Sequence, residues 1–413
     1  MKISVVGLGV EGQQATISLL KRGYDVYSSD INRHIDLSLC SKTPLSQMDG
    51  KLDLEIGSHN LDKIYKSDAV AVSPSLFNKQ ICKDIIERGI FISDIFTKHK
   101  DITTIAVTGT NGKTTTSHMI YNILKDEGYN AIIGGNGGGG FSGYIDLLMQ
   151  ANSEDYDYMI IEVCDMTLDF CSYVFDIDYV IVTNIGYDHM DVHGSIENYV
   201  AEVETFIESK PSILNINDEN LRKIEKTDLI HYFDTYTHPL NLFGKFNLQN
   251  AHAASILCEM LNVKRENIVK SLENFQCVEG RTIKINYMGK EIVAGKTDNV
   301  DALKAVLEEE YFDTVFIGTP RKHEKCRYNI LDYISSYKPE NLIIFPGLED
   351  TTYEYVQYLN DLKYTKDVLV LKNFDDIINY LTTQASKKVF IGGNGQAKIT
   401  QLTKYLCEND ENK

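Results

Sequence analysis

The run Gly109-Thr-Asn-Gly-Lys-Thr114 constrains the fold of this chain more than any other feature. An apolar run at residues 102–107 precedes it, and residues 117–125 follow it with the apolar spacing of a helix. A strand, a glycine-containing turn and a helix N-terminus cradle phosphate, because backbone N–H groups and the helix dipole face the anion. Lys113 would reach the terminal phosphates, and the hydroxyl of Thr114 would bind Mg²⁺. The run therefore predicts an α/β domain that binds ATP or GTP.

A second glycine-rich turn lies near the start of the chain, where Gly7, Gly9 and Gly12 follow a short apolar run. A further apolar run ends beside Asp30, which is the spacing of a Rossmann βαβ unit with its acidic residue. Alone, this pattern is also compatible with an oxidoreductase that binds NAD. That alternative leaves the phosphate loop at residues 109–114 unexplained.

Strand-like runs alternate with helix-like runs along the whole chain, which predicts an α/β fold with largely parallel sheets. A length of 413 residues suggests two or three domains. We expect a Rossmann-like N-terminal domain at residues 1–98, a central P-loop ATPase-type domain at residues 99–277, and a C-terminal Rossmann-like α/β domain at residues 278–413. In the last domain, strands are predicted at residues 314–317, 342–345, 368–371 and 388–391.

Composition and charge exclude several classes of protein. Formal net charge is −18, from 59 acidic and 41 basic residues, whereas nucleic-acid binding needs a basic surface. No apolar run approaches the roughly 20 residues of a membrane span, and the N-terminus has no signal-peptide pattern. The eight cysteines are scattered without a C-x-x-C pair, as in reduced cytosolic proteins. We expect a cytoplasmic monomer that contacts neither nucleic acid nor membrane.

Polar side chains follow the strand-like runs of the central segment where each run ends. Parallel sheets place their ligand sites at the carboxyl ends of strands. We therefore expect these polar side chains to lie at the ligand site. They are Glu162, Asn184, Asp188, His189, Asn217 and Asp218.

The order of motifs resembles the Mur ligase superfamily over essentially the whole chain, and within it the branch that adds D-glutamate in peptidoglycan synthesis. Each motif alone is weak, but the ordered set is specific. The shorter phosphate loop, with Val107 where the commonest pattern has glycine, is typical of these ligases. The other matching elements are Ser73-Pro74, Gly134-Gly-Asn136, Glu162-Val163, Asn184-Ile-Gly-Tyr-Asp-His-Met-Asp191, Asn215-Ile-Asn-Asp218, Phe246-Asn-Leu-Gln-Asn250 and Arg281.

The resemblance implies an ATP-dependent ligase that joins a carboxylate to an amine. The γ-phosphoryl group of ATP would convert the carboxylate to an acyl phosphate, and the amine would then displace phosphate. The acceptor would be a UDP-linked cell-wall peptide precursor, and a free amino acid would supply the amine. The residues implied to bind the UDP-linked substrate, without nicotinamide, are Gly7, Gly9, Gly12, Asp30, Ser73 and Asn136.

The resemblance also implies the residues of the ATP and Mg²⁺ sites. Those implied to bind ATP are Gly109, Thr110, Asn111, Gly112, Lys113, Thr114, Thr115, Asn250 and Arg281. The implied catalytic residues are Lys113, Glu162 and His189. Thr114 and Glu162 would hold one Mg²⁺, and His189 would help to hold a second, supported by Asp188. Asp191, His193 and Asn217-Asp218 are equally compatible with loop structure.

One departure from the family pattern concerns the metal site. Many relatives carry a carbamylated lysine where this chain has Val203. Glu202 and Glu204 flank that position, and our hypothesis is that a glutamate supplies the missing carboxylate, with Glu204 as the candidate metal ligand. A solvated helix face is the alternative interpretation.

Other departures concern the substrates. Residues 162–168 differ from the sequence that lies near the sugar-nucleotide acceptor in relatives, which leaves a different acceptor open. Lys296, Asp298 and Asn299 match the element implied to bind the amino acid, but Asp298 replaces a threonine. Its charge would repel an acidic side chain or attract a cationic amine, which argues against D-glutamate.

Three other functions fit the same residues. Archaeal ligases that build pseudomurein peptides resemble this pattern and use different amino acids. A Mur-like ligase could act on a non-wall carboxylate of the folate or tetrapyrrole type. A nucleotide-binding protein with a vestigial site would bind ATP without substrate-stimulated release of phosphate.

Overall fold

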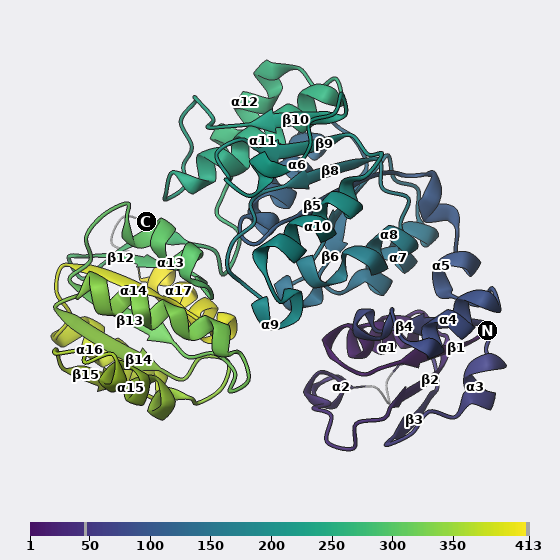
Figure 1. The fold of residues 1–413 in the computed structure, drawn as a ribbon, viewed down its shortest axis with the longest axis horizontal. Helices are drawn as coiled ribbons and strands as arrows, with labels where there is room; N and C mark the ends of the chain where they lie inside the picture. The colour runs from purple at the N-terminus through teal and green to yellow at the C-terminus, as the bar shows by residue number, and fades with distance from the viewer. Residues whose placement is uncertain (45–47, 410–413) are drawn as a thin grey trace.

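The computed structural model describes residues 1–44 and 48–409, which form three α/β domains, each built on its own sheet (Figure 1). The predicted α/β fold with largely parallel sheets is confirmed. The exact boundaries at residues 98/99 and 277/278 stay predictions. They fall between the last strand of one sheet and the first strand of the next.

The N-terminal sheet has four parallel strands in the order β3-β2-β1-β4. These strands are β1 (Lys2–Val6), β2 (Asp25–Asp30), β3 (Leu52–Ile56) and β4 (Ala69–Val72). The helices are α1 (Val10–Lys21), α2 (Ser38–Lys42), α3 (Leu61–Tyr65), α4 (Gln80–Glu87) and α5 (Ile92–Ile95). Gly12 lets α1 pack directly on the turn after β1, because a side chain there would collide with the carbonyl of Gly7.

The central sheet has six parallel strands in the order β10-β9-β8-β5-β7-β6. Its strands are β5 (Thr103–Thr108), β6 (Ala131–Gly135), β7 (Tyr158–Glu162), β8 (Tyr179–Val182), β9 (Ser212–Asn215) and β10 (Ile230–Phe233). Its helices are α6 (Lys113–Asp126), α7 (Tyr144–Ser153), α8 (Leu168–Val174), α9 (Met190–His193), α10 (Ile196–Ile207), α11 (Phe246–Met260) and α12 (Arg265–Glu273). Since β5 lies between two strands under helices on both faces, its residues are apolar or small and almost all buried.

The C-terminal sheet has the order β11-β12-β16-β13-β14-β15, with β11 antiparallel to β12 and all other pairs parallel. Its strands are β11 (Ile283–Tyr287), β12 (Lys290–Ala294), β13 (Thr314–Gly318), β14 (Asn341–Phe345), β15 (Val368–Val370) and β16 (Lys388–Gly393). Its helices are α13 (Val300–Leu307), α14 (Asn329–Tyr337), α15 (Thr352–Asp361), α16 (Phe374–Thr383) and α17 (Gln396–Glu408). All four strands predicted in this domain are present.

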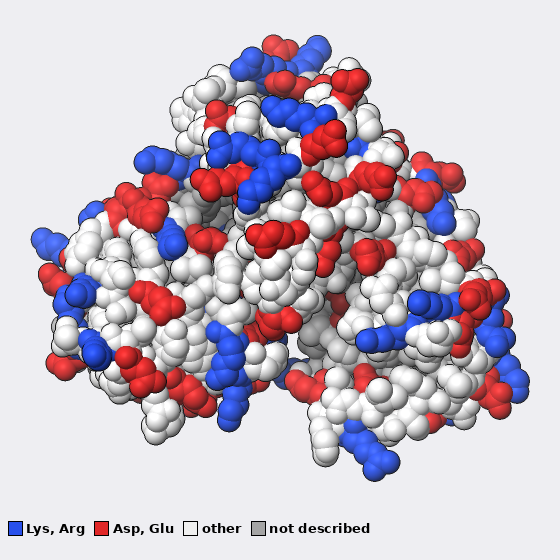
Figure 2. Space-filling model, viewed as in Figure 1, with Lys and Arg blue, Asp and Glu red and all other residues white. Residues whose placement is uncertain are grey.

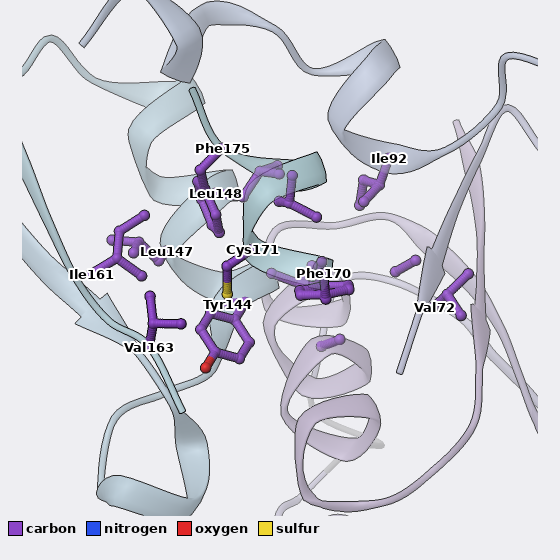
Figure 3. Close-up of a cluster of buried hydrophobic side chains, with 14 of the residues drawn as sticks. Val72, Ile92, Tyr144, Leu147, Leu148, Ile161, Val163, Phe170, Cys171 and Phe175 are labelled. Atoms are coloured by element: carbon purple, nitrogen blue, oxygen red, sulfur yellow. The ribbon is translucent and has the colours of Figure 1, made fainter. Parts of the chain in front are cut away.

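The hydrophobic cores do not follow the sheets one to one. One cluster runs from the N-terminal sheet into α7 and α8 of the central domain (Figure 3). There Val72 and Ile92 of the first domain lie near Phe170, which packs beside Tyr144 of the second. The C-terminal sheet has two clusters of its own, one on each face. The first two domains therefore share a core, whereas the third has its own clusters, one of which packs against Phe243 and Phe246 of the central domain.

Acidic and basic side chains alternate over the face shown in Figure 2, without a broad basic field on that face. This agrees with the formal charge of −18 for the whole chain. Within the described residues, no helix combines the length and apolarity that crossing a membrane requires.

Candidate active site

The phosphate loop occupies residues 109–112, between the end of β5 and the first residue of α6. Gly109 and Gly112 have φ values of 120° and 88°, which disfavour any residue with a side chain. A side chain at Gly112 would also collide with the amide of Asn250. The local sequence therefore forms the tight turn that leaves the N-terminus of α6 open to an anion.

Lys113 folds over its own loop. The Nζ atom donates to the carbonyl oxygens of Gly109, at 2.6 Å, and Thr110, at 3.0 Å. Burial alone would lower the pKa of Lys113, but the nearby carboxylates, Asp165 first among them, outweigh burial and raise it. The lysine is therefore charged, and two neutral carbonyls are its hydrogen-bond partners. Phosphate oxygens would be stronger acceptors for it.

Thr114 and Glu162 form an oxygen pair beside the loop. Glu162 is 1% exposed, and its carboxylate accepts from the Thr114 hydroxyl and from Asn136 Nδ2, the latter at 3.1 Å. Throughout residues 1–44 and 48–409, no lysine, arginine or histidine forms an ion pair with Glu162. A buried carboxylate next to a hydroxyl and without a paired cation suits Mg²⁺, which prefers oxygen ligands.

Arg281 reaches the same corner from the border of the C-terminal domain. Its Nη2 donates to Thr114 Oγ1 at 2.5 Å and to the carbonyl of Gly139 at 2.9 Å. Gly139 lies in the glycine run Gly134-Gly-Asn-Gly-Gly-Gly-Gly140. A side chain at Gly139 would collide with the carboxylate of Glu162. The glycine run thus allows a close approach of backbone to the Glu162 carboxylate.

Asp188 and His189 follow β8 at the carboxyl edge of the central sheet. Asp188 is buried, and its carboxylate lies 3.5 Å from Arg327 Nε and 3.3 Å from Asn299 Nδ2. Burial and the nearby Asp298 raise the pKa of Asp188. His189 has φ 51° at the start of α9, and its Nε2 lies 3.8 Å from Asp188 Oδ2.

On the opposite side, the C-terminal domain supplies a second charged group. Asp298 Oδ2 lies 3.0 Å from Lys296 Nζ and 3.5 Å from Arg327 Nη1. Burial would raise the pKa of Asp298, but Lys296 and Arg327 outweigh burial and hold it below its ordinary value. The negative charge already has two cationic partners. Asp298 therefore does not present the free anion that the sequence suggested for an incoming ammonium group.

One cavity of about 1090 Å³ joins these groups. Its lining includes the following residues that were predicted from the sequence: Thr110, Asn111, Gly112, Lys113, Thr114, Thr115, Asn136, Glu162, His189, Asn250, Arg281, Lys296 and Asp298. Asn184, Asp188, Asp191, Asn217 and Asp218 line it as well. The carboxyl ends of the central strands and the C-terminal domain therefore face each other across one space.

Asn299 lies just behind this lining and bridges the two domains. Its Oδ1 accepts from Ala302 N at 2.9 Å and so caps α13. Its amide also pairs with that of Asn111 in the phosphate loop, at 3.0 and 3.1 Å. These contacts connect the first turn of a C-terminal helix directly to the phosphate loop.

The N-terminal glycine turn lies apart from this cavity. Gly7, Gly9, Gly12, Asp30 and Ser73 are all outside its lining. Asp30 accepts from Leu8 N at 2.6 Å and from Asn32 N at 2.8 Å, so its carboxylate already satisfies a backbone donor of the turn. Of the residues expected to bind the UDP-linked substrate, Asn136 alone faces the cavity.

Glu204 is the predicted site residue whose placement does not support its assignment. It is exposed on α10 and does not line the cavity. Glu202 is also exposed and outside the cavity lining, but its Oε2 contacts a buried group, lying 2.6 Å from His193 Nδ1. Two residues along a helix correspond to a rotation of about 200°, so Glu202 and Glu204 lie on opposite faces.

Asp165, Arg327 and Asp301 are among the cavity-lining residues that the sequence analysis did not single out. Asp165 stands three positions after Glu162, and a carboxylate so close behind a strand end was a usable signal. Asp301 accepts from Tyr187 N at 2.8 Å, a contact between domains that no local pattern indicates.

Comparison with known proteins is consistent with this geometry. The family profile described as Mur ligase middle domain matches residues 107–232. The UDP-N-acetylmuramoylalanine–D-glutamate ligase of Christiangramia forsetii is 29% identical over 357 residues, which cover 76% of this chain and 78% of that protein. The enzyme of the same name from Acidobacterium capsulatum is 27% identical and covers 74% of each chain.

Solved structures share the fold along the full length. The pseudomurein peptide ligase type C from Methanothermus fervidus has a TM-score of 0.60 at 21% identity, and the match covers 98% of this chain and 99% of that one. The UDP-N-acetylmuramate-alanine ligase from Thermotoga maritima has a TM-score of 0.63 at 19% identity, and the match covers 99% and 98%.

A phosphate loop that faces a third domain across a shared cavity is the arrangement of an ATP-dependent ligase that forms C–N bonds. Similarity to known proteins indicates a narrower group within the ATP-dependent ligases. Residues 107–232 match the middle domain of the Mur ligases, and the chain is similar to the D-glutamate-adding branch of that superfamily. The family resemblance predicted from the motifs is thereby confirmed.

Proposed function

We propose that the protein uses ATP to join an amino acid to a carboxylate of a UDP-linked cell-wall peptide precursor, in peptidoglycan or pseudomurein synthesis. The observation that carries the proposal is the single cavity, because it places the phosphate loop, Glu162 and the Lys296–Asp298 pair around one space. A transferring phosphoryl group and an incoming amine must meet in such a space.

The reaction would proceed in two steps. An acceptor carboxylate oxygen attacks the γ-phosphorus of ATP, the bond to ADP breaks, and an acyl phosphate forms. The amine then attacks the acyl carbon, phosphate departs, and the amine nitrogen loses a proton. Catalysis of the first step depends on positioning and on stabilisation of charge at the phosphoryl oxygens.

The chain's own residues would divide this work. Backbone N–H groups of the phosphate loop would bind the β- and γ-phosphates, and Lys113 would exchange its two carbonyl partners for phosphate oxygens. Arg281 would contact the nucleotide from the third domain. Thr114 and Glu162 would hold Mg²⁺, which when bound neutralises the charge that develops on the phosphates. His189 would lie on the acceptor side of the same space.

The remaining predicted residues would bind the two other substrates. The UDP part would bind at the N-terminal turn that contains Gly7, Gly9 and Gly12, with its peptide directed past Asn136 toward the cavity. Lys296 would bind a carboxylate of the amino acid, and Asp298 would hold Lys296 in place.

Full-length similarity of fold favours a cell-wall acceptor over a folate-type acceptor. The folylpolyglutamate synthase from Thermotoga maritima matches 76% of this chain, whereas the pseudomurein ligase matches 98%. A folate-type ligase therefore leaves a substantial part of this chain without a counterpart.

The test is phosphate release from ATP and Mg²⁺ with a panel of UDP-linked acceptors and single amino acids. We expect release that requires one acceptor and one amino acid, and the panel should include UDP-muramoyl-L-alanine and UDP-linked glutamyl peptides. Lys113→Met should lower that release at least about 100-fold, because an electrostatic group at the phosphoryl oxygens is lost. ATP binding without release for any pair would contradict the proposal and favour a vestigial site.

A further inference from the structure

Asp165 is a buried carboxylate that faces the cavity and that the proposed mechanism has not used. It begins a short 3-10 turn, Asp165–Thr167, three residues after Glu162, and both residues line the cavity. Asp165 is 4% exposed. A carboxylate removed from water this fully requires compensating partners.

His193 is the main partner of Asp165. Its side chain is 1% exposed, with Nε2 at 2.8 Å from Asp165 Oδ2 and Nδ1 at 2.6 Å from Glu202 Oε2. Ionised carboxylates only accept hydrogen bonds, so both ring nitrogens act as donors. The ring also stacks on Tyr199, with 4.3 Å between centroids and 8° between planes. The imidazole is thus held at both nitrogens and on one face.

These contacts leave one carboxylate oxygen of Asp165 free to bind a cation. Oδ2 is bound to His193, whereas Oδ1, within the described part of the chain, accepts only from the thiol of Cys164, a weak donor at 3.5 Å. Asp165 lines the same cavity as Lys113, Glu162 and His189. An oxygen without a strong donor therefore lies where the phosphates of ATP would enter.

We propose that Asp165 is a second carboxylate ligand, beside Glu162, for the divalent cation that accompanies ATP, and that His193 and Glu202 are positioning residues that orient it. This inference rests on the proposed function. The described part of the chain has no cluster of three or more acidic, histidine or cysteine ligands that could hold a metal alone. That agrees with Mg²⁺, which binds through one or two carboxylates together with substrate phosphates.

The proposal replaces the hypothesis about Glu204. A glutamate of α10 does take part, but Glu202 acts through His193 and does not itself face the cavity. A carboxylate that binds a metal is commonly oriented by such an outer partner, and loss of the partner weakens metal binding about 10- to 100-fold.

The experiment measures binding of Mn²⁺, a paramagnetic substitute for Mg²⁺, in the presence of the non-hydrolysable analogue AMP-PNP. Electron paramagnetic resonance follows free Mn²⁺ during titration of the full chain, so turnover is not needed. We expect Asp165→Asn to raise the Kd for Mn²⁺ about 100-fold and Glu202→Ala about tenfold. The matched controls are Asp169→Asn, an exposed carboxylate of the same segment, and Glu204→Ala on the outer face of α10. Both controls should bind Mn²⁺ as the wild type does.

A wild-type Kd in both Asp165→Asn and Glu202→Ala would overturn the inference and leave the cluster a structural one. If Asp165→Asn fails to fold, Glu202→Ala decides, because the Glu202 side chain is 48% exposed and its removal leaves no cavity. Failure of the wild type itself to bind Mn²⁺ with AMP-PNP would instead contradict the proposed ATP site. The two failures are therefore distinguishable.

Discussion

The central domain meets its two neighbours in different ways. Against the N-terminal domain it shares one hydrophobic cluster (Figure 3). In this cluster Phe170 lies edge-on to Phe91, with 6.4 Å between the ring centroids. Against the C-terminal domain, Phe243 and Phe246 pack on one hydrophobic cluster. The other contacts around the cavity include polar pairs: Asn111 with Asn299, Asp188 with Arg327, and Tyr187 N with Asp301.

This difference bears on which domain can move. Separating an apolar interface costs about 25 cal/mol of free energy for each Å² of apolar surface that it exposes to water. A polar contact that is exchanged for contacts with water changes the free energy by only about 1 kcal/mol. A ligase of this kind must admit three substrates and then exclude water. We infer that the C-terminal domain opens and closes over the phosphate loop, while the first two domains move as one body.

The largest expected effect comes from disrupting the hydrophobic cluster that the first two domains share. Phe170→Ala deletes a buried ring between the first two domains and should lower the free energy of unfolding by about 3–5 kcal/mol. Urea unfolding measures the loss, and limited proteolysis should show cleavage between residues 73 and 102.

Phe316→Ala in the C-terminal core is the control, because it removes a ring of the same size from a cluster that the first two domains do not share. It should destabilise the protein without new cleavage between residues 73 and 102. A loss below about 1 kcal/mol in Phe170→Ala would show that the shared cluster does not hold these domains together.

Arg327 tests the polar interface. It lies between Asp188 of the central domain and Asp298 of the C-terminal domain, and its Nη1 donates to Asn394 Oδ1 at 2.7 Å. Arg327→Met leaves two carboxylates without this partner and should lower stability by about 3 kcal/mol. Arg327→Lys keeps the charge but loses the planar fork that bridges the domains. It should fold and still lower phosphate release at least tenfold, and full activity of this variant would contradict the bridging role.

Variants of Asn299 can distinguish its contact between domains, with Asn111, from its contact within a helix, the cap of α13. Asn299→Ala loses both the cap of α13 and the pairing with Asn111, and should cost about 1 kcal/mol of stability. Asn299→Asp is the matched variant, because its carboxylate still caps the helix but cannot donate to Asn111 and faces Asp188. We expect Asn299→Asp to raise the KM for ATP and also to lower stability, because a second buried carboxylate then lies beside Asp188. An unchanged KM for ATP would mean that the Asn111–Asn299 amide pair does not affect ATP binding at the phosphate loop.

The sequence was sufficient for the parts of this molecule that depend on local pattern. The phosphate loop, the polar residues at the strand ends and the four C-terminal strands all follow from short runs of residues. The β11–β12 hairpin was missed because its turn is Met288-Gly289, with φ 51° and 69°, and methionine is not a residue that signals positive φ.

Long-range partners were beyond the sequence for a different reason. Arg327 reaches Asp188 because β13 and β8 end on opposite sides of one cavity, and neither local sequence carries that information. The choice between Glu202 and Glu204 depended on which face of α10 turns inward, and Val203, buried between them, did not decide it. Helical phase must be known to within one residue for such an assignment.

A pH-dependent effect on stability is expected at Glu11, at the interface between the N-terminal and central domains. Its carboxylate accepts from Gly137 N at 2.7 Å and Tyr144 N at 3.1 Å, across the boundary between the first two domains. Burial raises the pKa of Glu11 from 4.5 to about 7, although both backbone donors oppose the shift. The folded protein therefore binds more protons than the unfolded chain between these values, and stability falls as pH rises through the window.

The expected loss is about 2–3 kcal/mol between pH 4.5 and 7.5, with little further change above that range. Glu11→Gln keeps one acceptor and the shape but cannot titrate, so it isolates this group from all others. Urea unfolding at pH 5 and pH 7.5 should show wild type losing stability relative to Glu11→Gln by that amount. A constant difference between the two proteins would mean that Glu11 ionises as in water and that the interface is not pH-sensitive. If wild type loses stability relative to Glu11→Gln between pH 5 and pH 7.5 but its proteolysis pattern does not change, the apolar core alone keeps these two domains together.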